Sequence, residues 1–174
     1  MNRYLIGVDL GSSSVKATVI NAETGASAGF SSSPEVEMEI SSPQYGWAEQ
    51  HPEVWWENTV AAVQGALKQA RAKAEDVLAI GISYQMHGLV IVDKDLKPLR
   101  PSIIWCDSRA VETGEDAFQQ LGELYCMDRL LNSPGNFTAS KLKWVKEHEP
   151  SIYSRVYKAM LPGDYLALKL TGEA

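Results

Sequence analysis

The sequence is poor in the features that mark secreted, metal-bound or membrane-spanning proteins. It contains only two cysteines, Cys106 and Cys126, which are too few for a disulfide framework and match no metal-ligand spacing. No stretch approaches the roughly 20 apolar residues that a helix needs to span a bilayer. The apolar run in MNRYLIGVDL is too short for a signal peptide. We therefore expect reduced thiols in a soluble, cytoplasmic protein.

The chain also lacks an excess of positive charge. It has 16 Lys and Arg against 22 Asp and Glu, which gives a net charge of −6. Nucleic acids and anionic membranes both select a basic protein face, so we expect neither as a partner. A small phosphorylated ligand stays open, because it requires only a few local donors.

What the chain does contain predicts an α/β domain with a mixed sheet. At 174 residues it fits one domain with a substantial core. Its first 33 residues predict an antiparallel meander of three strands, at 4–10, 14–21 and 26–33. A long helix is expected over 52–74, followed by further strands and helices in alternation. The apolar spacing in that helix predicts an inward face formed by Trp56, Val60, Val63, Leu67 and Ala70.

The stretch IGVDLGSSSVK, residues 6–16, places a carboxylate at a strand end, before a tight Gly-Ser loop. Such a loop offers amides, hydroxyls and one cationic side chain to phosphate oxygens. The candidate phosphate-binding residues are Gly11, Ser12, Ser13, Ser14 and Lys16. Asp9 would organise a hydrated Mg²⁺ on those phosphates. The alternative is an ordinary hairpin loop in which Asp9 forms the turn, since the spacing of a Walker loop is absent.

The hairpin context of this loop carries a resemblance. A strand, then Asp-x-Gly-Ser/Thr, then a second strand resembles the first phosphate loop of the superfamily of sugar kinases, actin and heat-shock ATPases. The resemblance implies a ribonuclease-H-like fold in two lobes, with ATP and Mg²⁺ held between the lobes. The present chain would be the N-terminal lobe, with its mixed sheet opened by the three-stranded meander.

The segment SYQMHGLV, residues 83–90, narrows the resemblance. It follows an apolar run that reads as a buried strand, and it contains one of only three histidines. It is similar to the QMHG segment of xylulokinases in the FGGY carbohydrate kinase family, which implies that Met86 and His87 face the sugar. A neutral imidazole donates and accepts hydrogen bonds, as adjacent sugar hydroxyls require, and Met86 would form an adaptable apolar wall. Taken alone, His87 would be a satisfied buried histidine at a strand end.

The segment SIIWCDSR, residues 102–109, resembles the family's Trp-x-Asp-x-Arg segment, which borders the sugar pocket. The resemblance implies that Asp107 accepts hydrogen bonds from sugar hydroxyls and that Arg109 holds Asp107 in place. An equally good interpretation is a structural salt bridge in which Asp107 caps a helix.

Three further segments extend the resemblance over the rest of the chain. GWAEQHPEVWW, residues 46–56, is similar to the family's entry into its first long helix, where we expect the tryptophans to pack rather than to contact a ligand. NFTASKLKWVKEH, residues 136–148, resembles the first FGGY signature, although Asn136 departs from the usual residue. LPGDYLALKLTGE, residues 161–173, resembles a scaffold segment of the family. The signature residues that match are Thr138, Lys141, Trp144 and Val145.

Together these segments imply ATP-dependent phosphorylation of a sugar, with D-xylulose converted to D-xylulose 5-phosphate as the leading reaction. The alternatives are another pentulose, gluconate or a polyol as the substrate, or a non-catalytic actin-like sugar-binding module. Glycerol is disfavoured, because glycerol kinases carry Arg-Glu where this chain has Met86 and His87.

The resemblance also implies that part of the catalytic machinery lies beyond Ala174. The family's general base and most of its adenosine pocket come later in the chain. We therefore expect residues 1–174 to form a truncated, incomplete N-terminal FGGY domain that lacks the C-terminal lobe and is inactive by itself. The sequence leaves the oligomeric state open, with a homodimer as the candidate.

Overall fold

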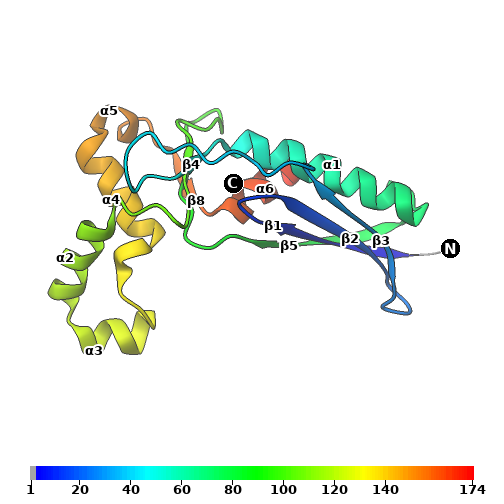
Figure 1. The fold of residues 1–174 in the computed structure, drawn as a ribbon, viewed down its shortest axis with the longest axis horizontal. Coiled ribbons are helices and arrows are strands. Elements are labelled where there is room, and N and C mark those ends of the chain that lie inside the picture. The colour runs from blue at the N-terminus through cyan, green and yellow to red at the C-terminus, as the bar shows by residue number, and fades with distance from the viewer. Residues whose placement is uncertain (1–2) are drawn as a thin grey trace. The chain divides into compact units, whose positions relative to one another are not determined.

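The computed structural model describes residues 3–174 and divides them into two compact units (Figure 1). Unit 1 comprises residues 3–39 and 53–85, and unit 2 comprises residues 40–52 and 86–174. Each unit has its own sheet structure, so each is described by itself.

Unit 1 is built on a four-stranded mixed sheet. The strands lie in the order β3-β2-β1-β5. β1 is antiparallel to β2 and parallel to β5, while β2 is antiparallel to β3. Their bounds are β1 Tyr4–Leu10, β2 Val15–Asn21, β3 Ser27–Ser33 and β5 Val77–Tyr84. The predicted three-stranded meander and the predicted mixed sheet are both confirmed.

The alternation of residues along β1 separates a core face from an outer face. Tyr4, Ile6, Val8 and Leu10 are buried, whereas the residues between them are exposed. Successive side chains of a strand point to opposite faces, so a period of two places every second residue in the core. Asp9 therefore lies on the outer face of β1.

Helix α1, Pro52–Ala70, packs against β3 through small residues. A Cβ added to Gly29 would lie 2.4 Å from the carbonyl oxygen of Ala66, and one added to Gly65 would lie 2.4 Å from Ser31 Oγ. Side chains at these positions would force the helix and strand apart, so glycine is required for the observed approach.

The buried face of α1 differs from the predicted one by one position. Trp55, Thr59, Ala62 and Ala66 form a buried stripe of the helix, whereas the predicted face, one residue further along, is partly buried. The large side chains of that stripe suggested a core face, but the close contact with β3 selects the smaller alanines. The helix also ends at Ala70, short of the predicted end, because Arg71 adopts a left-handed conformation with φ 52°.

Strand β5 exists as predicted but is not buried. Leu78 is 55% exposed and Ile80 is 39% exposed. Within residues 3–174, β5 pairs only with β1, so it forms an edge of the sheet. A strand at a sheet edge presents unpaired backbone groups. A run of apolar residues looks the same in the sequence whether its strand lies at an edge or is buried, so the sequence pattern alone could not predict this exposure.

Unit 2 contains two short ladders in place of a continuation of the large sheet. β4, Glu49–Gln50, pairs with β7, Ser102–Ile103, and β6, Val90–Val92, pairs with β8, Lys158–Met160; both pairs are antiparallel. The further strands expected after the long helix are therefore present in this unit, but each has only two or three residues.

The helices of unit 2 surround a small apolar core. They are α2 Val111–Leu121, α3 Glu123–Tyr125, η2 Cys126–Leu130, η3 Pro134–Asn136, α4 Thr138–His148, α5 Pro150–Tyr153 and α6 Pro162–Thr171. The core brings together Leu89, Ile91, Ile103, Ala110, Trp144 and Val145. Within the described part of the chain, no helix has the length and apolar character required to cross a bilayer.

Candidate functional site

The candidate phosphate loop connects β1 to β2 in unit 1. Asp9 and Lys16 are opposed in the antiparallel ladder, and Lys16 Nζ lies 3.9 Å from Asp9 Oδ2. Both side chains are 55% exposed. The hairpin register, which follows from the alternating strand pattern, thus places one carboxylate and one ammonium side by side on the outer face of the sheet.

The loop itself is closed by backbone hydrogen bonds. The Gly11 amide donates to the Ser14 carbonyl at 3.0 Å, and the Met38 amide donates to the Ser13 carbonyl at 2.8 Å. A Cβ on Gly11 would lie 3.1 Å from the Ser14 carbonyl oxygen, so glycine eases this tight closure. The structure therefore brings all six predicted residues of this loop together on one hairpin.

The donor set of the loop fits phosphates with Mg²⁺ and does not fit an all-protein metal site. No group of three or more His, Cys, Asp or Glu side chains within residues 3–174 could hold a metal ion. Mg²⁺ is commonly held by one or two carboxylates together with substrate phosphates and water. A single exposed carboxylate at Asp9, beside a Gly-Ser turn, is compatible with that arrangement.

The second candidate site is the turn at residues 86–88 in unit 2. Met86 is 65% exposed. His87 adopts a left-handed backbone conformation with φ 60°, which is uncommon for a residue other than glycine. Gly88 is required by close packing, because a Cβ there would lie 2.5 Å from Pro162 Cγ. The turn therefore holds an exposed methionine and a half-buried histidine in a specific conformation.

The electrostatic environment of His87 favours its neutral form. Burial lowers the pKa of the imidazole from its ordinary value, and the nearby Lys141 ammonium lowers it further. At neutral pH the ring therefore keeps one donor and one acceptor nitrogen, as hydrogen bonding to vicinal hydroxyls requires.

The third pair of predicted residues, Asp107 and Arg109, forms a buried ion pair. Arg109 Nη2 lies 2.7 Å from Asp107 Oδ2, and their side chains are 1% and 0% exposed. Asp107 Oδ2 also accepts a hydrogen bond from the Ala48 amide at 2.6 Å, and Oδ1 accepts one from the Arg109 amide at 2.9 Å. Both carboxylate oxygens are thus occupied by protein donors, which is the geometry of the structural salt bridge. Asp107 does not cap α2, whose N-cap position is Ala110.

This ion pair belongs to a larger network that the sequence did not indicate. Arg109 Nη2 also lies 2.8 Å from Glu49 Oε1, and Glu49 in turn pairs with Arg100. Arg100 Nη1 lies 2.6 Å from Glu149 Oε2. Each guanidinium contacts two carboxylates, so the network compensates most of the charge that would otherwise be costly to bury.

Two tryptophans enclose the Arg109 guanidinium, whose central carbon lies 3.8 Å from the Trp47 ring centroid and 5.1 Å from that of Trp144. The two indoles meet edge to face at 5.3 Å. Trp55 is fully buried in unit 1. Trp47 and Trp55 therefore pack inside the protein, as predicted.

Lys141 and Phe137 support the His87 turn, and sequence reasoning assigned neither of them a role there. Lys141 is fully buried, and its Nζ donates to the His87 carbonyl at 2.8 Å. The Phe137 ring stacks on the His87 imidazole with centroids 5.0 Å apart. The signal available in the sequence was that Lys141 matches the FGGY signature, which names no partner for its charge.

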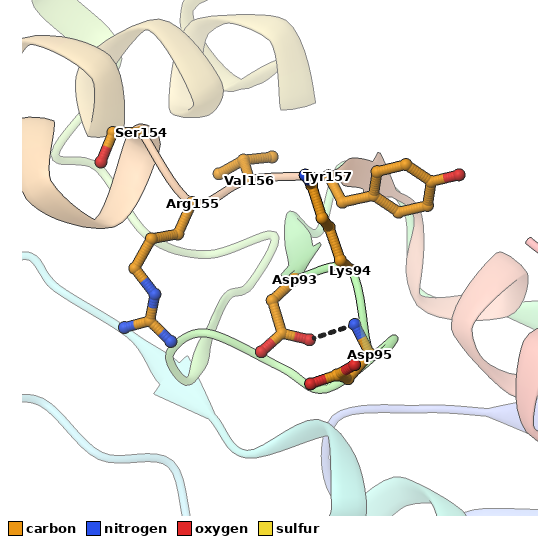
Figure 2. Close-up of a pocket in the computed structure, with 7 residues that line it drawn as sticks. All are labelled: Asp93, Lys94, Asp95, Ser154, Arg155, Val156 and Tyr157. Atoms are coloured by element: carbon orange, nitrogen blue, oxygen red, sulfur yellow. Dashed lines mark hydrogen bonds between the residues drawn. The ribbon is translucent and has the colours of Figure 1, made fainter.

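Unit 2 also contains a surface hollow that is lined by other residues. It has a volume of about 370 Å³ and is lined by residues 93–95 and 154–157 (Figure 2). The Asp93 carboxylate is occupied by its own turn, since Oδ1 accepts hydrogen bonds from the amides of Asp95 and Lys97 at 3.0 Å each. The hollow contains none of the predicted site residues, and we assign it no function.

Comparison with known proteins identifies the family. Residues 4–174 match the model of the FGGY family of carbohydrate kinases, N-terminal domain. The match covers both units and includes the hairpin loop, the His87 turn and the Asp107 segment.

Individual relatives agree with this match. The chain is 37% identical to the xylulose kinase of Staphylococcus xylosus over 97% of its own length and 34% of the relative. It is 36% identical to the L-xylulose/3-keto-L-gulonate kinase of Escherichia coli (strain K12), over 99% of this chain and 34% of that protein. The solved xylulose kinase of Rhodospirillum rubrum superposes with a TM-score of 0.84 at 26% identity, over 98% of this chain and 34% of that structure.

These matches confirm the mixed α/β fold of a sugar kinase that the resemblance implied. The chain spans about a third of the length of the relatives that it matches. Because the family model covers nearly every residue, this chain belongs to the FGGY family of carbohydrate kinases.

Proposed function

We propose that the whole protein is an ATP-dependent carbohydrate kinase that phosphorylates D-xylulose to D-xylulose 5-phosphate. The observation that carries the proposal is the exposed Met86 beside a neutral, conformationally fixed His87, in a chain of this family. The 37% identity to a xylulose kinase supports a pentulose or a related sugar as the class of substrate.

In this proposal His87 hydrogen-bonds sugar hydroxyls, and Met86 forms an apolar wall beside them. In the same proposal, Asp107 and Arg109 border the sugar pocket. Because both Asp107 oxygens already accept hydrogen bonds from protein donors, the ion pair supports the wall and does not itself bind the sugar.

The hairpin loop of unit 1 contributes the phosphate site. Gly11, Ser12, Ser13 and Ser14 form the loop that approaches the phosphates of ATP, Lys16 adds positive charge, and Asp9 orients the hydrated Mg²⁺. When bound, Mg²⁺ neutralises charge on the transferring phosphoryl group.

The remaining machinery is assigned to chain outside residues 1–174. Phosphoryl transfer of this kind uses a carboxylate that accepts the proton of the attacking hydroxyl, and we assign that base and the adenosine pocket to a C-terminal lobe. Residues 1–174 are then an incomplete N-terminal domain, inactive without the rest. We place the enzyme in the cytoplasm, where ATP is available, with a homodimer as the candidate assembly.

A different sugar is the first alternative. A relative at 36% identity is named for L-xylulose and 3-keto-L-gulonate, so overall similarity at this level does not select one sugar. Another pentulose, gluconate or a polyol would fit the same turn. The alternative from another class is a non-catalytic actin-like module that binds sugar without transferring phosphate.

The test is an assay of sugar-dependent ATP consumption by the whole protein, against pentuloses, hexonates and polyols. We expect the highest kcat/KM for D-xylulose. His87→Ala should weaken sugar binding by roughly 10- to 100-fold, the loss typical of one buried hydrogen bond of about 1–3 kcal/mol, and leave ATP binding intact. His51→Ala, at an exposed histidine of the same unit, is the control and should bind sugar like the wild type.

The outcomes separate the alternatives. A higher kcat/KM for another sugar would replace D-xylulose. Binding without ATP consumption would favour the non-catalytic module. A His87→Ala protein that melts early yet binds sugar normally while folded would show that His87 is structural.

A further inference from the structure

The His87 turn accepts a hydrogen bond from helix α4. His87 has φ 60°, a left-handed conformation that costs an ordinary residue roughly 1 kcal/mol or more. A conformation of this kind persists only where surrounding contacts hold it. The His87 carbonyl accepts a hydrogen bond from Lys141 Nζ at 2.8 Å.

Lys141 is placed as a cross-link between two loops. The same Nζ donates to the Asn136 carbonyl at 3.1 Å, so one ammonium joins residues 87 and 136. The residue is completely buried. Burial lowers the pKa of Lys141 to about 8, with the Asp107 carboxylate opposing the shift. A methionine would fill this volume without the cost of burying a charge, so the position is explained by its hydrogen bonds and not by packing alone.

Two neighbours of Lys141 hold other parts of the same turn. The Phe137 ring stacks on the His87 imidazole, with centroids 5.0 Å apart and planes inclined by 20°. Thr138 Oγ1 donates to the Gly88 carbonyl at 3.3 Å. The segment 137–141 therefore contacts the ring of His87, its carbonyl and the next carbonyl, and it leaves Met86 exposed.

We propose that Lys141 is a positioning residue for sugar recognition, which fixes the His87 carbonyl and, together with Phe137, the plane of the imidazole without touching the sugar. The inference rests on the proposed role of His87 as a sugar ligand. With the backbone and ring plane both fixed, the two imidazole nitrogens point in defined directions, so the turn is organised before the sugar binds. Loss of Lys141 would leave His87 present but free to reorient.

The test is a double-mutant cycle on sugar affinity in the whole protein. Lys141→Met alone should raise the KM for the preferred sugar about tenfold and change kcat and the KM for ATP by less than about threefold. Because Lys141 acts through His87, the double variant Lys141→Met/His87→Ala should bind sugar no more weakly than His87→Ala alone. Lys143→Met, an exposed lysine on the same helix, is the matched control and should leave all these constants unchanged.

A second readout does not depend on catalysis. The stacked Phe137 ring should shift the ¹H resonances of the His87 imidazole upfield in spectra of ¹³C-histidine-labelled protein, with His87→Ala providing the assignment. Lys141→Met should move these resonances toward ordinary values, whereas Lys143→Met should not. If Lys141→Met does not fold, Phe137→Leu removes the stacking with similar volume, and the cycle with His87→Ala should be non-additive in the same way.

The failures are distinguishable. A wild-type protein that consumes no ATP with any sugar overturns the proposed function, and the His87 resonances still decide whether Lys141 holds the ring. Additive losses of sugar affinity in the cycle, or unchanged His87 resonances in Lys141→Met, overturn the positioning role.

Discussion

Two pairs of an aspartate and a basic residue lie in the two units of this chain, and they are opposite in character. In unit 1, Asp9 and Lys16 approach to 3.9 Å with both side chains 55% exposed. In unit 2, Asp107 and Arg109 approach to 2.7 Å with side chains almost completely buried. Both pairs come from segments that resemble ligand-binding motifs, yet their surroundings give them different capacities.

The difference shows which pair is available for chemistry. An exposed ion pair contributes little to stability, about 0–1 kcal/mol, and its charges remain accessible to a ligand. A buried pair is costly to disrupt, because removal of one partner leaves the other charge unpaired in the interior. We therefore expect substitutions in the first pair to affect catalysis, and substitutions in the second pair to affect folding.

The largest effect should follow from Asp107→Ala. Removal of this carboxylate leaves the Arg109 guanidinium short of a partner and the Ala48 amide without its acceptor. Disruption of a buried ion pair of this kind costs about 3–5 kcal/mol. Chemical denaturation of the whole protein, followed by tryptophan fluorescence, should show the loss directly, since Trp47 and Trp144 contact Arg109.

Asp128→Ala is the matched control for this experiment. Asp128 forms an exposed pair with Arg129 at 3.0 Å, with side chains 73% and 69% exposed, so its removal should change stability by less than about 0.5 kcal/mol. An Asp107→Ala protein that unfolds like the wild type but binds sugar weakly would reverse our assignment and make Asp107 a sugar ligand.

The next largest effect should be catalytic and belongs to the exposed pair. Asp9→Asn keeps the shape of the side chain and removes its charge, so the folded protein should be nearly as stable as the wild type. If Asp9 orients Mg²⁺ on the phosphates, kcat should fall by about 100-fold or more, with little change in the sugar KM. Steady-state kinetics with sugar and ATP varied in turn provides the measurement.

Asp95→Asn, at another exposed aspartate, should leave kcat unchanged. An Asp9→Asn enzyme with the kcat of the wild type would return the loop to an ordinary hairpin, and the contrast between the two pairs would then concern stability alone.

The elements with a strong local pattern were predictable from the sequence. The strands of the meander alternate cleanly, and the hairpin register that pairs Asp9 with Lys16 follows from that alternation. The helix at Pro52 was predicted with its start correct, but its buried face was displaced by one position. Large apolar residues dominate a periodicity analysis, whereas the actual contact is made by alanines and by Gly65, which allow the closest approach to β3.

The parts that depend on long-range pairing were not predictable. The burial of Asp107 depends on the Ala48 amide, 59 positions away in sequence. β4 has only two residues, too few for any pattern, and it supplies Glu49 to the network through its pairing with β7. Lys141 matched a family signature, but its hydrogen bond to the carbonyl of His87 spans 54 positions. Local sequence shows that a lysine is present in the helix but does not show what it binds.

The smallest effect is expected from Lys141, which extends the comparison of exposed and buried charges to a third case. Lys141 is a buried cation whose hydrogen bonds go to two carbonyls and not to a carboxylate. Its pKa is about 8 in the folded protein, lowered chiefly by burial, against an ordinary value near 10.4 in the unfolded chain. Below pH 8 both states carry the proton, and the wild type bears the cost of the buried charge. Between pH 8 and about 10.4 the unfolded state binds the proton that the folded state has released, so stability rises with pH.

The difference in unfolding free energy between the wild type and Lys141→Met should therefore shift in favour of the wild type by about 2 kcal/mol from pH 7 to pH 9.5.

The Cys106 thiol would add a pH dependence of its own to this measurement. Burial raises the pKa of that thiol, and Lys141 opposes the shift. A thiol pKa that is raised in the folded state lowers stability as pH rises, and the size of this effect would differ between the two proteins. Both proteins should accordingly carry Cys106→Ser. Denaturation curves at four or five pH values give the slope. A difference that stays constant with pH would show that Lys141 is not desolvated, and the contrast between exposed and buried charges would not extend to this residue.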